Sequence, residues 1–213
     1  MVKTTVSTMK NMAENGADLR ERVLEIASKL FYERSVRAVG VDLVVAKAGV
    51  AKTSLYRHFR TKDDLVAAFL SREDKDFWNI WDEVAQMHTS DPAAELDAHL
   101  FWIGERVGRP NYRGCPQINV AAEFPESDHP ARKVAHDHKA ELRRRLTVLA
   151  ERLGATEPEE LGGQLAVLVN GAFVSSQMLT GEEAVPLLQH MAHALVESGC
   201  AREVSTLEQP GQG

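Results

Sequence analysis

Hydrophobic residues recur every three to four positions along most of the chain, which is the period of an amphipathic helix. Alternation of apolar and polar residues, the pattern of a half-buried strand, is absent, and no segment repeats. The pattern therefore predicts an all-α fold of about nine helices. The first opens at residue 18 and runs for about four turns, a long one opens after residue 61, and the others are expected at 41–48, 51–59, 93–107, 117–123, 129–153, 157–179 and 184–198.

Two pairs of residues spaced three apart predict where helices begin. Asp18 with Glu21, and Thr61 with Asp64, have the spacing of a capping box, in which each side chain bonds the other residue's backbone N–H. Residues 1–17 are polar and lack periodicity, which predicts a mobile N-terminal tail. The domains expected from this organisation are the tail, an N-terminal domain at 18–64, a larger domain at 65–205 and a C-terminal tail at 206–213.

Composition predicts a protein of the cytoplasm. The chain has 213 residues, of which 44% are apolar and 26% charged, so it is long enough to bury a core and too apolar to be disordered. Its two cysteines are too few for a disulfide framework, which favours a reducing compartment. The most apolar stretch, 165–174, is interrupted by Asn170 and is too short to cross a bilayer, so no membrane partner is expected.

The first part of the chain and the rest of it differ in the sign of their net charge. The formal charge of −6 argues at first against a nucleic-acid partner, because phosphates call for basic surface. Residues 1–64, however, contain 12 Lys and Arg against 8 Asp and Glu, whereas residues 65–213 contain 13 against 23. Within the first part, residues 46–62 carry five Lys and Arg and no acidic residue. A basic head therefore precedes an acidic body, although a solvated basic helix face would look the same.

Two short predicted helices meet at Ala48-Gly49-Val50, which is the layout of a helix-turn-helix. Glycine suits such a turn because it adopts a left-handed conformation without a Cβ clash. Leu55 and Phe59, four residues apart, are expected to anchor the second helix to the core. The side chains left for its outer face are hydroxyls and cations, which reach phosphate oxygens and base edges.

At these residues the chain resembles the tetracycline-repressor (TetR) family of bacterial transcription regulators. The run at 48–65, AGVAKTSLYRHFRTKDDL, is similar almost position by position to the family signature AGVSxxTLYxHFxxKxxL. The resemblance implies a three-helix DNA-binding domain at 18–64 and a ligand-binding, dimerising domain at 65–205. It also implies a homodimeric repressor that a small molecule releases from a palindromic double-stranded DNA operator. The sequence itself contains no familiar metal-ligand spacing, phosphate-binding glycine loop or catalytic motif, so no catalytic residue, metal or cofactor is expected. The residues that the resemblance assigns to DNA binding are Lys52, Thr53, Ser54, Tyr56, His58 and Lys62. Arg57 is added to them because it lies on the predicted outer face of the same helix.

Four departures from the family pattern are visible in the sequence. Ser35 replaces the glycine that usually follows the first helix, which predicts a different cap or strain there. Val39 and Gly40 replace the usual Thr or Ser at the start of the second helix, and Ala51 replaces a frequent serine before the third, so both N-caps are expected to be weak. Asp42 stands where some relatives place a cation against DNA. None of these changes removes the predicted phosphate contacts.

The acidic part of the chain is compatible with dimerisation through the last two predicted helices. Apolar residues cover more than one face of 157–179, and small residues there, such as Gly171, permit close helix approach. Together with 184–198 this helix is expected to form a four-helix interface by two-fold symmetry. An ordinary intramolecular core would give the same pattern.

A ligand cavity is expected among the middle helices, where aromatic residues are concentrated. Apolar walls with a few polar groups suit a hydrophobic or aromatic effector. Core packing explains any single one of these residues equally well. The residues predicted to line the cavity are Trp78, Trp81, His99, Trp102, Cys115, Asn119, His136, Asn170 and Phe173.

Three alternatives remain open at this point. Cys115 lies in a Gly-Cys turn that resembles the turn of family members in which a cysteine responds to oxidants or electrophiles, although a packing role is also compatible. The protein could instead be an all-α small-molecule-binding protein or enzyme whose basic segment is incidental. The sequence also does not separate a repressor from an activator, and it names neither the effector nor the operator.

Overall fold

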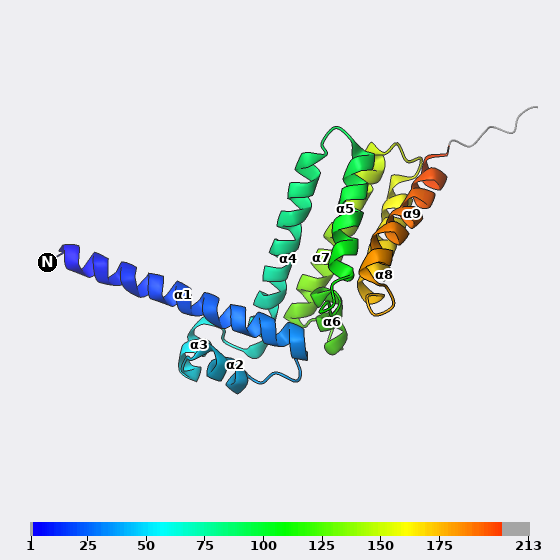
Figure 1. Ribbon diagram of the computed structural model, residues 1–213. Helices are drawn as coiled ribbons and strands as arrows, with labels where there is room; N and C mark the ends of the chain where they lie inside the picture. The colour runs from blue at the N-terminus through cyan, green and yellow to red at the C-terminus, as the bar shows by residue number, and fades with distance from the viewer. Residues whose placement is uncertain (1, 202–213) are drawn as a thin grey trace, which may run out of the picture. The chain divides into compact units, whose positions relative to one another are not determined.

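A computed structural model of the chain describes the backbone of residues 2–201 and the side chains of residues 17–201. Within that range the fold is all-α, as predicted, with nine helices and no strand (Figure 1). They are α1 (Val2–Arg34), α2 (Val41–Ala48), α3 (Lys52–His58), α4 (Lys62–Met87), α5 (Pro92–Val107), α6 (Pro116–Glu123), α7 (Pro130–Arg152), α8 (Pro158–Val174) and α9 (Gly181–Cys200).

The start of α1 was predicted wrongly. The helix begins at Val2, so the Asp18–Glu21 pair lies inside the helix and does not cap it. Of the two tails expected from the sequence, residues 1–17 overlap the part of α1 whose side chains are not described, and residues 206–213 lie outside the described residues. Both remain predictions.

The connection between α8 and α9 also differs from the prediction. The structure ends α8 at Val174, five residues before the predicted end, and Ser175 N–H bonds the carbonyl of Gly171 at 3.0 Å as the helix stops. Thr180 then forms a capping box with Glu183: Thr180 N donates to Glu183 Oε2 at 3.2 Å, and Thr180 Oγ1 donates to the same oxygen at 2.8 Å. This cap starts α9 at Gly181, earlier than predicted, because the chain must turn before Thr180.

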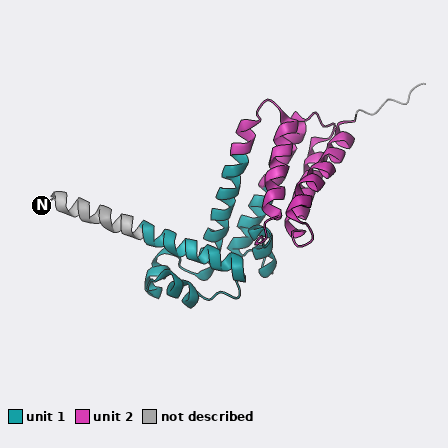
Figure 2. Ribbon diagram, in the orientation of Figure 1, with its two compact units in different colours: residues 1–82, 113–140 teal, residues 83–112, 141–213 magenta. Residues whose placement is uncertain are grey.

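The chain divides into two compact units (Figure 2). Unit 1 comprises residues 1–82 and 113–140, and unit 2 comprises residues 83–112 and 141–213. The helices α4 and α7 each continue from one unit into the other. The units are defined by compactness, whereas the division expected at residue 64 is one of function, so that division stays a prediction.

Unit 1 has one hydrophobic core that joins the first three helices to α4, α6 and α7. Phe31 of α1 and Phe69 of α4 meet near its centre, with ring centroids 5.9 Å apart. Val120 of α6 and Ala131 and Ala135 of α7 are buried in the same core. The three-helix head therefore shares its interior with segments that lie about 80 residues further along the chain.

Unit 2 packs α5, α8, α9 and the second part of α7 around leucine and isoleucine side chains that are almost fully buried, such as Ile103, Leu146 and Leu165. The approach of α5 to α9 requires glycine, because a Cβ on Gly104 would lie 2.7 Å from Val185 Cγ2. In the part of the chain that is described, no helix is long and apolar enough to cross a lipid bilayer.

Candidate nucleic-acid interface

The turn between α2 and α3 has the predicted left-handed glycine. Gly49 adopts φ 65° and ψ 37°, and its N–H bonds the carbonyl of Val45. Val50 N–H bonds the same carbonyl at 3.1 Å, which closes the end of α2. A side chain at position 49 would be strained whatever the space around it, because φ is positive. The local sequence therefore specifies the turn of the helix-turn-helix.

Buried anchors orient α3 as the sequence predicted. Leu55 and Phe59 are buried in the core of unit 1, and the Arg20 guanidinium lies over the Phe59 ring, 5.1 Å from its centroid. The opposite face is therefore left to polar side chains. Of the residues assigned to DNA binding, Lys52, Thr53, Tyr56 and Arg57 are exposed, and Ser54, His58 and Lys62 are half-buried.

The weak caps predicted around this motif are present. Neither Gly40 before α2 nor Ala51 before α3 makes a side-chain cap bond. Ser35 adopts φ 71°, the conformation that glycine would take there without strain. By contrast the capping box at the start of α4 forms as predicted, with Thr61 N to Asp64 Oδ2 and Asp64 N to Thr61 Oγ1 both at 3.0 Å.

Lys52 at the start of α3 forms an ion pair with α2. Its Nζ lies 2.7 Å from Asp42 Oδ1, and the hydrogen bond to this carboxylate raises the pKa of Lys52. Both side chains are well exposed, so solvent screens the pair. Asp42 thus holds a cation of the recognition helix close to the surface that would face DNA.

Val36, in the connection between α1 and α2, is held from both sides. Its N–H donates to Glu123 Oε1 of α6 at 3.1 Å, and the next N–H, of Arg37, donates to Glu123 Oε2 at 2.8 Å. Its carbonyl accepts a hydrogen bond from Lys62 Nζ of α4 at 2.6 Å. We call these contacts the Val36 junction. Sequence reasoning missed it because the partners are separated by 26 to 87 residues.

The junction changes the interpretation of Lys62. Burial lowers the pKa of Lys62, against the opposing effect of Glu123 and Asp63, and its ammonium is already bonded to Val36. A contact between Lys62 and a phosphate therefore requires sharing or breaking this bond. Tyr56 and Arg57, which are exposed, have no such conflict and are the better probes of DNA binding.

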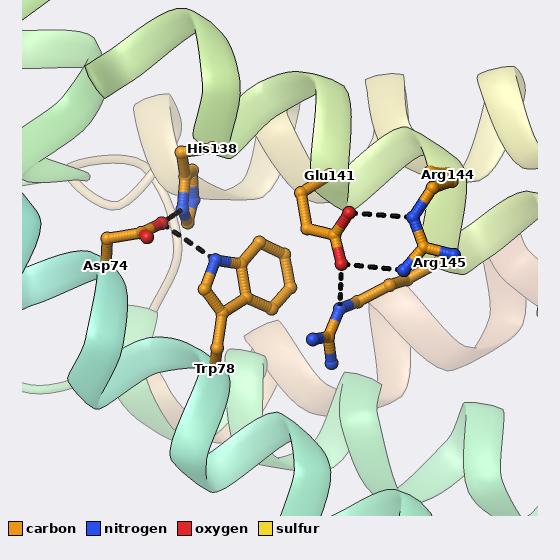
Figure 3. Close-up of polar contacts among 6 residues, drawn as sticks. All are labelled: Asp74, Trp78, His138, Glu141, Arg144 and Arg145. Atoms are coloured by element: carbon orange, nitrogen blue, oxygen red, sulfur yellow. Dashed lines mark hydrogen bonds and ion pairs between the residues drawn. The ribbon is translucent and has the colours of Figure 1, made fainter.

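Unit 1 also brings together an aromatic cluster that includes two of the predicted ligand residues. The rings of Trp78 and Trp81 lie 5.8 Å apart, and Phe77 stacks on Trp81 at 6.1 Å. Figure 3 shows that Asp74 and Trp78 of α4 meet His138 of α7. Asp74 Oδ1 accepts a hydrogen bond from Trp78 Nε1 at 2.7 Å and lies 2.7 Å from His138 Nδ1, so the carboxylate favours the ring form protonated at Nδ1.

Sequence reasoning did not include Asp74 or His138 in the site. Asp74 and Trp78 are four residues apart on α4, a spacing at which helix side chains meet, and this signal was available. The partner on α7 had no comparable signal. His138 is buried with its ring 5.0 Å from Phe77 and 5.1 Å from Trp78.

The other predicted ligand residues fall into both units. In unit 1, Asn119 Nδ2 donates to the carbonyl of Arg113 at 2.8 Å, and His136 has 82% of its side chain exposed, next to Asp137. In unit 2, Phe173 is buried, Trp102 is half-buried, and Asn170 Nδ2 donates to the carbonyl of Ala166 in its own helix at 2.7 Å. A role in ligand binding remains a prediction for each.

Cys115, at the N-cap of α6, lies beside a lysine that the sequence did not point to. Lys139 Nζ donates a hydrogen bond to Cys115 Sγ at 3.7 Å, and burial lowers the pKa of Lys139. The loop before Cys115 is fastened to α1, because Tyr32 Oη accepts from Arg113 N at 2.9 Å and donates to the carbonyl of Gly114 at 3.4 Å. Both cysteines of the chain are free thiols.

His99 of α5 is buried in unit 2, where Glu95 Oε1 lies 3.6 Å from its Nε2. Burial, with smaller effects of His88 and Arg145, lowers the pKa of His99 from 6.5 to about 3. The folded protein therefore keeps His99 neutral in a pH range where the unfolded chain protonates it. The free energy of unfolding should fall as pH decreases from 6.5 toward 3, by at most about 1.4 kcal/mol per pH unit from this residue.

We expect His99→Phe to weaken this pH dependence. Urea unfolding between pH 6.5 and 5 measures it, because most carboxylates stay ionised in that window. The wild-type protein should lose more stability over the window than the variant does. Equal losses in both proteins would show that His99 is protonated in the folded state.

Glu141 and two arginines form a charged group on α7. Glu141 accepts hydrogen bonds from Arg144 Nε and Arg145 Nε, each at 2.7 Å (Figure 3). These bonds lower the pKa of Glu141 to about 2, with Arg144 the larger contributor. Among the described residues, no group of three or more His, Cys, Asp or Glu side chains comes together in a way that could hold a metal ion.

Comparison with known proteins places this arrangement in a family. The model of bacterial regulatory proteins of the tetR family matches residues 23–69, which include the helix-turn-helix. The HTH-type transcriptional regulator LmrA of Bacillus subtilis is 27% identical over 177 residues, which cover 80% of this chain and 92% of LmrA.

Solved structures agree over almost their whole length. A TetR-family transcriptional regulator from Streptomyces coelicolor matches with a TM-score of 0.81 and 25% identity, covering 87% of this chain and 97% of that chain. A putative TetR transcriptional regulator from Streptomyces avermitilis matches with a TM-score of 0.73 and 30% identity, covering 86% of this chain and 99% of that chain. The helix-turn-helix geometry, the sequence relatives and these structures lead to one conclusion: the chain belongs to the TetR family and is a DNA-binding transcriptional regulator.

Proposed function

We propose that the protein is a homodimeric repressor that binds a palindromic operator and leaves it when a small hydrophobic or aromatic ligand binds. The observation that carries the proposal is the exposed polar face of α3, presented by a helix-turn-helix whose other face is buried. A single recognition helix reads one half-site, so two copies are needed for a palindrome. TetR-family regulators bind DNA operators as dimers and respond to small-molecule effectors.

The dimer interface is supported by apolar side chains that the single chain leaves in solvent. On α8, Val167 and Val174 have 73% and 63% of their surfaces exposed, and the space around Gly171 between them is open. On α9, Leu187 and Met191 are exposed as well. Monomeric proteins rarely expose such residues in rows at helical spacing, so a second copy is the expected cover.

The effector class is supported by the aromatic cluster of unit 1. Phe77, Trp78 and Trp81 form a cluster of packed rings, of which Phe77 and Trp81 are buried, and the Asp74–His138 pair supplies polar groups beside it. Sites of this composition bind mainly apolar molecules and orient them through a few polar contacts. The proposed effector is accordingly an aromatic compound with at least one hydrogen-bonding group.

Operator binding is tested with Arg57→Ala on the DNA upstream of the protein's own gene. We expect the variant to bind at least about tenfold more weakly, because each of the two heads then makes one fewer bond to a phosphate or a base. The slope of log affinity against log salt concentration should also become shallower, by about one for each phosphate that is no longer neutralised. Fluorescence anisotropy at two salt concentrations measures both quantities.

Arg109→Ala is the matched control. Arg109 is an exposed cation outside the helix-turn-helix, so its removal changes the net charge equally without touching α3. If both variants weaken binding alike, the effect is one of total charge, and the assignment of α3 to the operator is wrong. A reporter driven by the same DNA distinguishes repression from activation, since loss of a repressor raises expression.

A second candidate function is supported by the contact between Lys139 and Cys115. Lys139 Nζ donates a hydrogen bond to the buried Cys115 sulfur at 3.7 Å, and a cation beside a thiol is an environment in which cysteines react with oxidants and electrophiles. Modification of the thiol would disturb a loop that Tyr32 ties to α1, within the DNA-binding unit. The protein would then respond to reactive compounds through Cys115.

This second function predicts that N-ethylmaleimide releases the protein from its operator and that Cys115→Ser prevents the release. Lys139→Met should slow the labelling of Cys115 by several-fold, because the sulfur loses its neighbouring cation. Cys200→Ser is the control, since Cys200 donates to the Leu153 carbonyl in unit 2. Release that persists in Cys115→Ser would remove Cys115 from the mechanism.

A further inference from the structure

A cavity lies within unit 1, and its lining includes none of the clustered rings of Phe77, Trp78 and Trp81. It has a volume of about 270 Å³ and is bounded by the end of α1, by α4 and by α6. Phe31, Phe69 and Val120 form an apolar floor, and the two rings lie 5.9 Å apart. The space suits one aromatic ring with one small substituent, because larger drug-like ligands occupy larger cavities.

One side of the cavity carries a cation whose backbone is fixed. Arg113 lines the opening, and its N–H donates to Tyr32 Oη at 2.9 Å while its carbonyl accepts from Asn119 Nδ2 at 2.8 Å. No acidic side chain among the described residues forms an ion pair with its guanidinium. A guanidinium presents a planar set of donors that matches a carboxylate.

The lining of the cavity also includes a carboxylate that already accepts two hydrogen bonds. Glu123 lines the wall and accepts hydrogen bonds from Val36 N and Arg37 N with its two oxygens. Its negative charge stays in place and opposes a second anionic group on a ligand that faces it. The lining of the cavity therefore combines two aromatic rings with one cation and one anion that is held in place.

We propose that this cavity binds a small aromatic monocarboxylate, with the ring on Phe31 and Phe69 and the carboxylate on Arg113. The site is distinct from the effector site proposed above, since Asn119 is the one predicted ligand residue that lines it in the described part of the chain. It adjoins the Val36 junction through Glu123. A ligand bound there contacts the same elements that hold the connection between α1 and α2.

The test uses the full-length protein and para-fluorobenzoate, observed by fluorine NMR. We expect saturable binding with a dissociation constant on the order of 1 mM, as befits a ligand of about ten heavy atoms. Arg113→Gln keeps the backbone bonds and should weaken binding at least about tenfold, because the charge-assisted hydrogen bonds can no longer form. Val120→Phe should abolish binding by filling the cavity, and thermal melting checks that this variant folds.

Two controls make the outcome decisive. Arg109→Gln removes an exposed cation of unit 2 and should leave the affinity unchanged. The neutral analogue para-fluorobenzamide should bind at least about tenfold more weakly than the acid. The proposal is overturned if no saturable binding occurs up to about 10 mM, if the amide binds as well as the acid, or if Arg113→Gln binds like the wild-type protein.

Discussion

Replacing Val167 with aspartate is expected to convert the proposed dimer into monomers and to weaken operator binding at least about a hundredfold. The side chain lies on the exposed row of α8, and a carboxylate there would face its own symmetry mate across a two-fold interface. Burying two like charges without partners costs more than a small interface supplies. Without the dimer, each DNA-binding head binds its half-site independently. Linking two binding modules raises the overall affinity by a factor of about 10² to 10⁴, and this gain would be lost.

Sedimentation equilibrium and anisotropy on the same samples measure the two effects. Val148→Asp is the matched control, because Val148 is also an exposed valine of unit 2 but lies on α7, outside α8 and α9. Its dimerisation and its operator affinity should match those of the wild-type protein. If Val167→Asp remains dimeric, or if Val148→Asp dissociates equally, the interface does not lie on α8.

Replacing Arg152 with alanine is expected to lower the free energy of unfolding by about 3 kcal/mol. Arg152 Nη1 lies 2.5 Å from Glu95 Oε2, and its Nη2 donates to the carbonyl of Thr89 at 3.1 Å. The Glu95 side chain is almost completely buried, so the substitution leaves a buried carboxylate without its cation. This expected loss of stability is at the low end of the range for breaking a buried ion pair, because the Arg152 side chain is 35% exposed to solvent.

Urea unfolding of two further variants identifies the cause. Arg144→Ala removes an arginine whose bond to Glu141 lies on the surface, and it should cost less than about 1 kcal/mol. Adding Glu95→Gln to Arg152→Ala should restore part of the stability, because the buried group is then neutral. Equal losses from Arg152→Ala and Arg144→Ala would mean that the Glu95 pair is no stronger than a surface pair.

Features specified by neighbouring residues were predicted well from the sequence. The bounds of α2, the left-handed Gly49 and the inward-facing Leu55 and Phe59 all follow from spacing within about 20 residues. The capping box at Thr61 was also predicted, and the one at Thr180 was equally readable but was missed. In these places the helix period and cap chemistry suffice, because the relevant contacts are local.

Features that depend on distant contacts could not be predicted. Nothing near Lys62 in the sequence indicates that its ammonium binds the Val36 carbonyl, and a family pattern suggested a phosphate instead. The contacts of His138 with Asp74 and of Lys139 with Cys115 depend on how α7 packs, and the sequence does not indicate that packing. The early start of α1 is a different case, since the apparent cap at Asp18 is compatible with a position inside a helix.

The Val36 junction limits how far the DNA-binding head can be treated as a transferable module. A chimera that joined residues 18–64 to the body of another regulator would keep Lys62 but lose Glu123, leaving the N–H groups of Val36 and Arg37 without their acceptor. It would also open the core that Val120 and Ala135 close. The smallest portable unit is therefore discontinuous in sequence, and exchange of operator specificity among such regulators is better made by substitutions on α3 than by exchange of heads.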